Sequence, residues 1–206
     1  MKRPDFNLAV SSLIQHVRET MPEFAHLEPR RVLVVAGEAR RASRGTVKPL
    51  AFAKGKRHDA FGRKKPLVKV NGVRMLYCVT LRPLFFRAST PRARVATVLH
   101  ELFHISRKFD GTLDRARRHA RLGARFDARF RPLARRLWKG LPAELRDAFA
   151  YDGEVKVLQW LERPTAWLPG ERGSGRRVYT EEHLFHGIVR MKTRSKSLVA
   201  RLSAPT

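Results

Sequence analysis

The feature that most constrains this chain is a stretch that holds two histidines and a glutamate at fixed spacing. Residues 90–106 read TPRARVATVLHELFHIS, in which His100, Glu101 and His104 form the pattern H-E-x-x-H. Residues four apart lie on one face of an α-helix, so the two histidines can bind one metal ion. Neutral imidazole is a preferred zinc ligand, and the neighbouring carboxylate can accept a proton from a water on the metal. The pattern therefore predicts a zinc site with Glu101 as general base.

The residues around the motif favour a helix that packs against a core. Thr90 is a preferred N-cap, and Pro91 suits the first helical position. Apolar residues recur at the spacing of one buried helical face: Val95, Val98, Leu99, Leu102 and Phe103. A buried helix whose histidines only form hydrogen bonds is the alternative interpretation of this stretch.

The charge of the chain is strongly one-sided. It has 44 Lys and Arg against 18 Asp and Glu, which gives a net charge of +26. Self-repulsion of this size destabilises a compact state, and a polyanionic partner such as DNA or RNA is the usual reason for it. The alternative is an arginine-rich composition inherited from a GC-rich genome.

Several classes of protein are disfavoured by the composition. Cys78 is the only cysteine, so neither an intrachain disulfide nor a cysteine-based zinc finger can form. No segment approaches the ~18–20 apolar residues of a membrane span. We expect a cytoplasmic protein, with the nucleoid as one place of action. We also expect a single domain over residues 1–194 and a disordered basic tail over 195–206. The oligomeric state is not predicted.

Most strand signals lie before the motif, and residues 155–161 resemble a late strand after it. Residues 31–36 are a β-branched apolar run that predicts a buried strand, and 47–53 is a weaker candidate. Residues 67–80 alternate around Asn71-Gly72, the preferred type I′ turn of a β-hairpin. A sheet beside a metal-binding helix can offer its edge to an extended peptide.

Helix signals surround these strands. Residues 5–21 and 143–150 predict helices, and Thr180 is expected to begin a last one. Residues 113–139 predict a long helix with one apolar stripe and an outer face of arginines: Arg117, Arg118, Arg121, Arg125, Arg129, Arg131, Arg135 and Arg136. The resulting fold class is α+β, with a small, mostly antiparallel sheet packed on the motif helix and on this second helix.

A catalytic zinc ion usually has three protein ligands and one open position. His119 is the first candidate for the third ligand, because it lies on the inward stripe of the second helix, one turn before Gly123. Asp110 is the second candidate, and Asp127, Glu144 and Glu154 remain open. Glu182, His183 and His186 can be taken as another site, although the end of a surface helix explains them more simply.

Four segments resemble the metallopeptidases found in phages, prophages and bacteria. They are HELFHIS at 100–106, FDGTL at 109–113, RHARLGARFD at 118–127 and GIVRMKTR at 187–194. The resemblance implies a minimal zincin fold that acts on peptides or proteins. It also implies one zinc ion on His100, His104 and His119, with Glu101 catalytic. SprT-like proteases, which often act on DNA-bound proteins, are a more distant resemblance. They carry a cysteine-based zinc ribbon, which this chain lacks because Cys78 is its only cysteine.

Other functions stay open beside a zinc peptidase. A basic nucleic-acid-binding protein with a structural or degenerate metal site is the main alternative. A zinc hydrolase of RNA would place a ligand at Asp110, and a deformylase would use Cys78. Candidates for stabilising the oxyanion are Tyr77, Arg115 and Arg118.

Overall fold

The computed structural model describes residues 3–38, 43–117, 119–123, 125–165 and 177–193; the expected tail, 195–206, lies outside them. The helices are α1 (Phe6–Thr20), α2 (Pro83–Arg87), α3 (Pro91–Phe103), α4 (His119–Leu122), α5 (Arg125–Gly140) and α6 (Ala143–Ala150). The strands are β1 (Val32–Ala36), β2 (Gly45–Pro49), β3 (Leu67–Val70), β4 (Val73–Arg74), β5 (Tyr77–Leu81), β6 (Gly153–Trp160), β7 (Val178–Tyr179) and β8 (Leu184–Met191). Helices combined with small mixed and antiparallel sheets confirm the α+β class.

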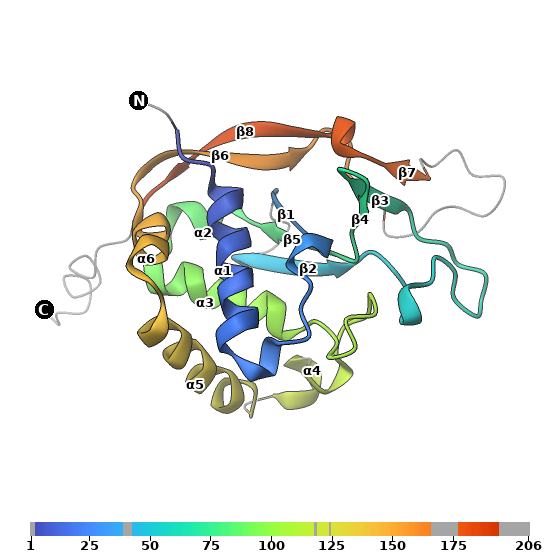
Figure 1. The fold of residues 1–206 in the computed structure, drawn as a ribbon, viewed down its shortest axis with the longest axis horizontal. Helices are drawn as coiled ribbons and strands as arrows, with labels where there is room; N and C mark the ends of the chain where they lie inside the picture. Colours follow the sequence, from blue (N-terminus) through green and yellow to red (C-terminus); the bar gives the residue numbers. More distant parts are fainter. Residues whose placement is uncertain (1–2, 39–42, 118, 124, 166–176, 194–206) are drawn as a thin grey trace, which may run out of the picture.

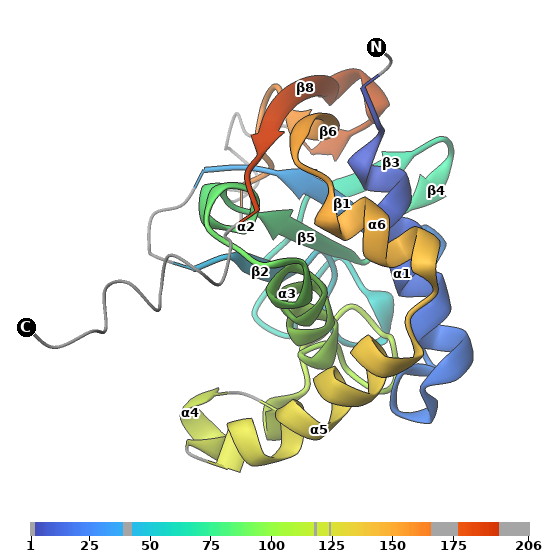
Figure 2. The same cartoon turned by 90° about the vertical axis from the view of Figure 1, so that its left-hand side faces the viewer.

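The central sheet has the strand order β1-β5-β2. β5, the middle strand, runs parallel to β1 and antiparallel to β2, and these two strands lie at the edges of this sheet. β3 pairs with β4 and β7, and β6 pairs with β8 in a two-stranded ribbon. The ribbon lies at one end of the molecule, and α4 and α5 lie at the other (Figures 1 and 2). Among the helices that the structure describes, none is long and apolar enough to cross a membrane.

The predicted hairpin is confirmed only around its turn. Asn71 and Gly72 have the positive φ angles of a type I′ turn, 49° and 76°, and connect β3 to β4. β4 ends at Arg74, and the chain then enters the central sheet as β5. Every residue of β5 is buried, which suits a middle strand covered on both faces rather than one arm of a hairpin.

Two predicted helices differ in the structure. The predicted helix 113–139 is divided into a 3-10 turn, α4 and α5, and Gly123 lies at the break with a φ of 50° in the left-handed region. The helix predicted at Thr180 is wrong. A single 3-10 turn is followed by β8, because pairing with the distant β6 takes up this segment.

Asn7 joins the ribbon to the central sheet. Its side-chain amide donates to the carbonyl of Val34 in β1 at 2.7 Å. Its amide oxygen accepts from the backbone N–H of Leu158 in β6, also at 2.7 Å. Asn7 lies in the first turn of α1, so one side chain fixes the helix against both sheets.

A buried arginine holds α3 in place. Arg94 is 0% exposed. Its guanidinium donates to carbonyl oxygens of Phe85, Phe86, Phe149, Tyr151 and Lys192, at distances between 2.8 and 3.4 Å. These carbonyls lie at the C-terminal ends of α2 and α6 and after β8. Helix C-termini carry partial negative charge, so they offset the desolvation of the cation.

We predict that Arg94→Lys lowers the free energy of unfolding by about 2–4 kcal/mol, because an ammonium group cannot reach all of these carbonyls. Chemical denaturation measures the change. The matched control is Arg92→Lys, at an exposed position of the same helix, which should change stability by less than about 0.5 kcal/mol. Equal effects of the two substitutions would contradict the role given to Arg94.

Candidate metal centre

The imidazole rings of His100, His104 and His119 lie together. The Nε2 atom of His100 is 3.2 Å from that of His104 and 2.9 Å from that of His119. One ligand atom from each of the three lies within 4.8 Å of the others, and no other such group of histidine, cysteine or acidic residues occurs among the described residues. Tetrahedral zinc with Zn–N bonds of ~2.0–2.1 Å would separate its nitrogens by about 3.3 Å. The spacing of the three nitrogens therefore suits a small divalent cation.

A backbone carbonyl orients the second histidine of the motif. His104 Nδ1 lies 3.0 Å from the carbonyl oxygen of Arg117. A carbonyl only accepts hydrogen bonds, so Nδ1 must carry the proton and donate it. In the neutral ring, Nε2 then presents a lone pair towards the other two histidines. This arrangement, with the outer nitrogen held by a carbonyl, is typical of metal-binding histidines.

An aromatic side chain from α5 packs against all three imidazoles. The ring centroid of Phe126 lies 4.0 Å from that of His119, 4.9 Å from His100 and 5.6 Å from His104. Phe130, one turn further on, lies 5.2 Å from His100. The helix that follows Gly123 thus covers one side of the cluster with apolar surface.

The surroundings of the cluster favour neutral imidazoles. Burial lowers the pKa of His100 to about 4, and the proximity of His104 and His119 adds to this effect. Burial also lowers the pKa of His104. Metal ions bind the neutral form, so these two side chains are in the protonation state that a ligand needs.

Glu101 lies in a different environment, between α3 and the edge strand β2. Its side chain is buried, and burial raises the pKa of the carboxyl to about 7. The backbone N–H of Val47 donates to the carboxylate and lowers this pKa, and the nearby positive charge of Arg82 also lowers it. A Cβ atom at Gly45 would lie 3.1 Å from Glu101 Oε1, so the glycine leaves room for this carboxylate beside the strand.

Arg117, predicted to lie on an exposed arginine face, is instead buried against the end of α3. Its guanidinium donates to the carbonyl of Phe103 at 3.1 Å, pairs with Asp114 at 3.3 Å and lies 4.4 Å from the centre of the Phe103 ring. These contacts connect the end of α3 to the segment that leads to His119. The outward-facing prediction was wrong at this position because helical periodicity does not apply to a 3-10 turn. The spacing of Asp114 three residues earlier is the sequence signal that could have shown it.

The oxyanion candidates have other surroundings. The hydroxyl of Tyr77 donates to the carbonyl of Thr112 and accepts from the N–H of Gly111, both at 2.9 Å. Tyr77 therefore holds the turn that follows α3. Arg115 is exposed, and Arg118 lies outside the described residues.

The remaining ligand candidates do not join the histidines. Asp110 accepts from the hydroxyl of Thr112 at 2.6 Å, and Asp127 pairs with Arg131 at 2.6 Å. Glu154 pairs with Arg3 at 2.7 Å, and Glu144 is exposed on α6. In the second group, Glu182 and His186 are exposed, and His183 accepts from the N–H of Thr180 at the start of the 3-10 turn.

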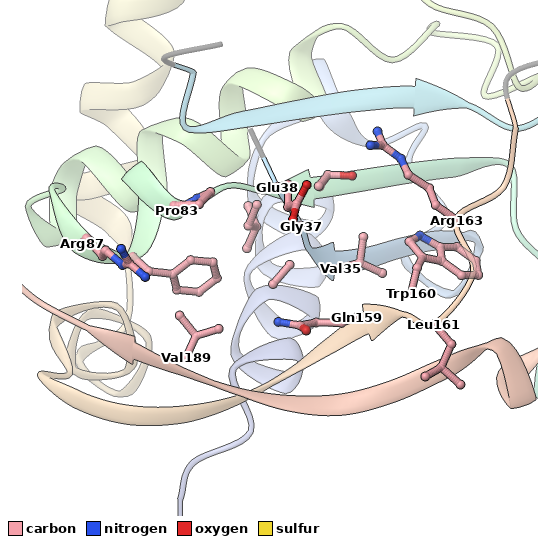
Figure 3. Close-up of a pocket in the computed structure, with 14 residues that line it drawn as sticks. Val35, Gly37, Glu38, Pro83, Arg87, Gln159, Trp160, Leu161, Arg163 and Val189 are labelled. Atoms are coloured by element: carbon pink, nitrogen blue, oxygen red, sulfur yellow. The ribbon is translucent and has the colours of Figure 1, made fainter. Parts of the chain in front are cut away.

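A separate cavity of about 470 Å³ lies where the parallel strands β1 and β5 end. Figure 3 shows its polar lining, which includes Glu38, Arg87, Gln159 and Arg163. It shares no residue with the histidine cluster or with Glu101.

Comparison with known protein families identifies a related family. A family model described as "Putative phage metallopeptidase" matches residues 2–141. The match confirms the resemblance seen in the motif segments, includes both motif histidines, Glu101 and His119, and leaves out the segment 187–194. No curated protein and no solved structure matches the chain.

We predict that a divalent cation stabilises the protein through the three histidines. Zinc at 100 times its dissociation constant should add about 2.7 kcal/mol to the free energy of unfolding, measured by denaturation with and without the ion. His119→Ala should remove most of this gain. His186→Ala, at an exposed histidine outside the cluster, should keep it. An undiminished gain in His119→Ala would exclude His119 as a ligand.

Proposed function

The chain belongs to the phage metallopeptidase family, and on that premise we propose that it is a zinc-dependent peptidase with Glu101 as its general base. His100, His104 and His119 would hold one zinc ion. The observation that carries the proposal is the convergence of three imidazole nitrogens within 4.8 Å, two from the motif at the end of α3 and one from α4, beside the buried carboxylate of Glu101.

Peptide hydrolysis needs an activated water and a proton carrier. Zinc, when bound, polarises the scissile carbonyl and lowers the pKa of a water molecule towards ~7. Glu101 accepts the proton that this water gives up as its oxygen bonds to the carbonyl carbon. It then delivers the proton to the nitrogen of the leaving amine as the C–N bond breaks. Burial raises the pKa of Glu101 to about 7, which suits a group that must both accept and donate at neutral pH.

The edge strand β2 is the element that we propose to bind the substrate backbone. The N–H of Val47 points towards Glu101 rather than towards β5. In an antiparallel pair, the N–H and C=O groups of every second residue of β2 therefore face away from β5, at the edge of the sheet. An extended peptide can add to such an edge through main-chain hydrogen bonds. Pairing there would bring a peptide bond beside Glu101.

A second candidate function is nucleic-acid binding, by which the protein would act on nucleic-acid-associated proteins. It rests on Arg121, Arg125, Arg129 and Arg135, which are exposed along α4 and α5 and form no ion pair within the described residues. Arginines spaced along a helix can contact successive phosphates.

Glu101→Gln should lower peptidase activity by about 100- to 10,000-fold, because the amide cannot take the proton from water. The assay is cleavage of a proteome-derived peptide mixture by zinc-loaded protein, followed by mass spectrometry. The variant should retain its zinc, which metal analysis measures. Glu144→Gln, at an exposed glutamate of α6, should behave like the unchanged protein. Full activity in Glu101→Gln would rule out the proposed base.

The nucleic-acid candidate predicts DNA binding that weakens steeply with salt. Replacing Arg125, Arg129 and Arg135 by serine should reduce the slope of log affinity against log salt by about 0.9 per lost phosphate contact. The control replaces the exposed Arg18, Arg30 and Arg190, which lie on other elements. Binding that is absent, or insensitive to salt, would remove this candidate.

A further inference from the structure

A wide groove adjoins the proposed catalytic site. Its volume is about 1200 Å³, and it lies between residues 49–65 and residues 106–115. Gly55 N–H donates to the carbonyl of Asp110 at 2.8 Å and connects its two sides. A Cβ atom at Gly111 would lie 2.5 Å from that of Ala51, so only glycine permits this close approach. We name this groove, between residues 49–65 and 106–115, the basic groove, after the positive charges that line it.

The groove has an excess of unpaired positive charge. Five exposed cations line it and form no ion pair with any described residue: Lys54, Lys56, Arg107, Lys108 and Arg115. Lys65, by contrast, is buried in the wall, where its ammonium group donates to two backbone carbonyls at 2.9 Å.

The carboxylates of the groove are already engaged. Asp59 accepts from the N–H groups of Phe61 and Arg63 and pairs with the Arg63 side chain. Asp110 accepts from Thr112, and Asp114 pairs with the buried Arg117. These acids therefore hold the loops in shape and do not neutralise the exposed cations.

Residues of the groove lining are close neighbours of both parts of the proposed catalytic site. Pro49, the last residue of β2, is also the first residue of the groove lining. Ser106 lies in the lining two residues after His104, and the N–H of Asp114 donates to the carbonyl of His104 at 2.8 Å. A peptide that pairs with β2 beside Glu101 and runs past Pro49 would therefore reach the groove.

We propose that the basic groove binds acidic side chains of the substrate on one side of the cleaved bond, an inference that rests on the proposed peptidase function. Separate lysines and arginines can pair with carboxylates spaced along a polypeptide. A polypeptide is the favoured occupant, because the lining begins at Pro49, the last residue of the strand that we propose to bind the substrate backbone. At the rim, the ring of Phe61 is 83% exposed and offers an apolar contact beside the charges.

The test compares cleavage profiles of the zinc-loaded full chain on a proteome-derived peptide mixture. Asp and Glu should be enriched on one side of the cleaved bond, and added salt should weaken the preference. Reversing three charges with Lys56→Glu, Arg107→Glu and Lys108→Glu should lower kcat/KM for an acidic reporter peptide by at least about 10-fold, while its uncharged amide counterpart changes by less than about twofold. Reversing Arg18, Arg30 and Arg190 should leave both peptides unaffected. Thermal unfolding checks that each variant is folded.

Two outcomes would overturn the inference. One is cleavage without acidic preference, which would leave the peptidase function intact. The other is a single-stranded oligonucleotide that binds more tightly than the acidic peptide and whose binding is lost in the variant with Lys56, Arg107 and Lys108 reversed to glutamate.

A binding measurement separates this inference from the peptidase function. Fluorescence anisotropy of a labelled Asp- and Glu-rich decapeptide on Glu101→Gln needs no turnover. If zinc-loaded protein cleaves no peptide, the peptidase proposal fails, whereas groove-dependent binding of the decapeptide would still support an acidic polypeptide partner. Absence of that binding would overturn the groove assignment.

Discussion

The position of the motif helix depends on the buried guanidinium of Arg94. A cation at this depth is tolerated only because carbonyl oxygens from α2, α6 and the end of β8 surround it. These segments are far apart in sequence, so one side chain joins three parts of the chain to α3. The cost of leaving any of these groups unpaired makes the arrangement specific. Because these contacts fix α3, they also fix the orientation of His100 and His104 towards its C-terminal end.

The histidine cluster is built from two segments that backbone groups hold together. His104 donates to the carbonyl of Arg117, and the Arg117 side chain returns to the carbonyl of Phe103. This reciprocal pair fixes the turn before α4, and His119 follows two residues later. Phe126 then covers the rings from α5. The third histidine is therefore placed by contacts of its neighbours rather than by a long helix.

Charge is distributed unevenly over the molecule. Phenylalanine rings cover one side of the cluster, and burial lowers the pKa of His100 and raises that of Glu101. Many of the exposed cations lie along α5 and in the basic groove. In the proposed function, the apolar surroundings would keep the histidine ligands neutral and raise the pKa of the proton carrier, while the positive groove would bind the acidic partner.

The sequence by itself determined the motif helix, its N-cap and the candidate residues His100, Glu101, His104 and His119, because local spacing and residue chemistry carry that information. It also predicted α1, α6, β1, most of β6 and the Asn71-Gly72 turn. The tertiary structure decided the rest. β5 lies in the middle of the central sheet rather than in the predicted hairpin. β8 is a strand in a segment predicted to be a helix, and Arg117 is buried although it was predicted to be exposed. Each of these depends on partners more than ten residues away, and neither periodicity nor propensity records such distant pairing.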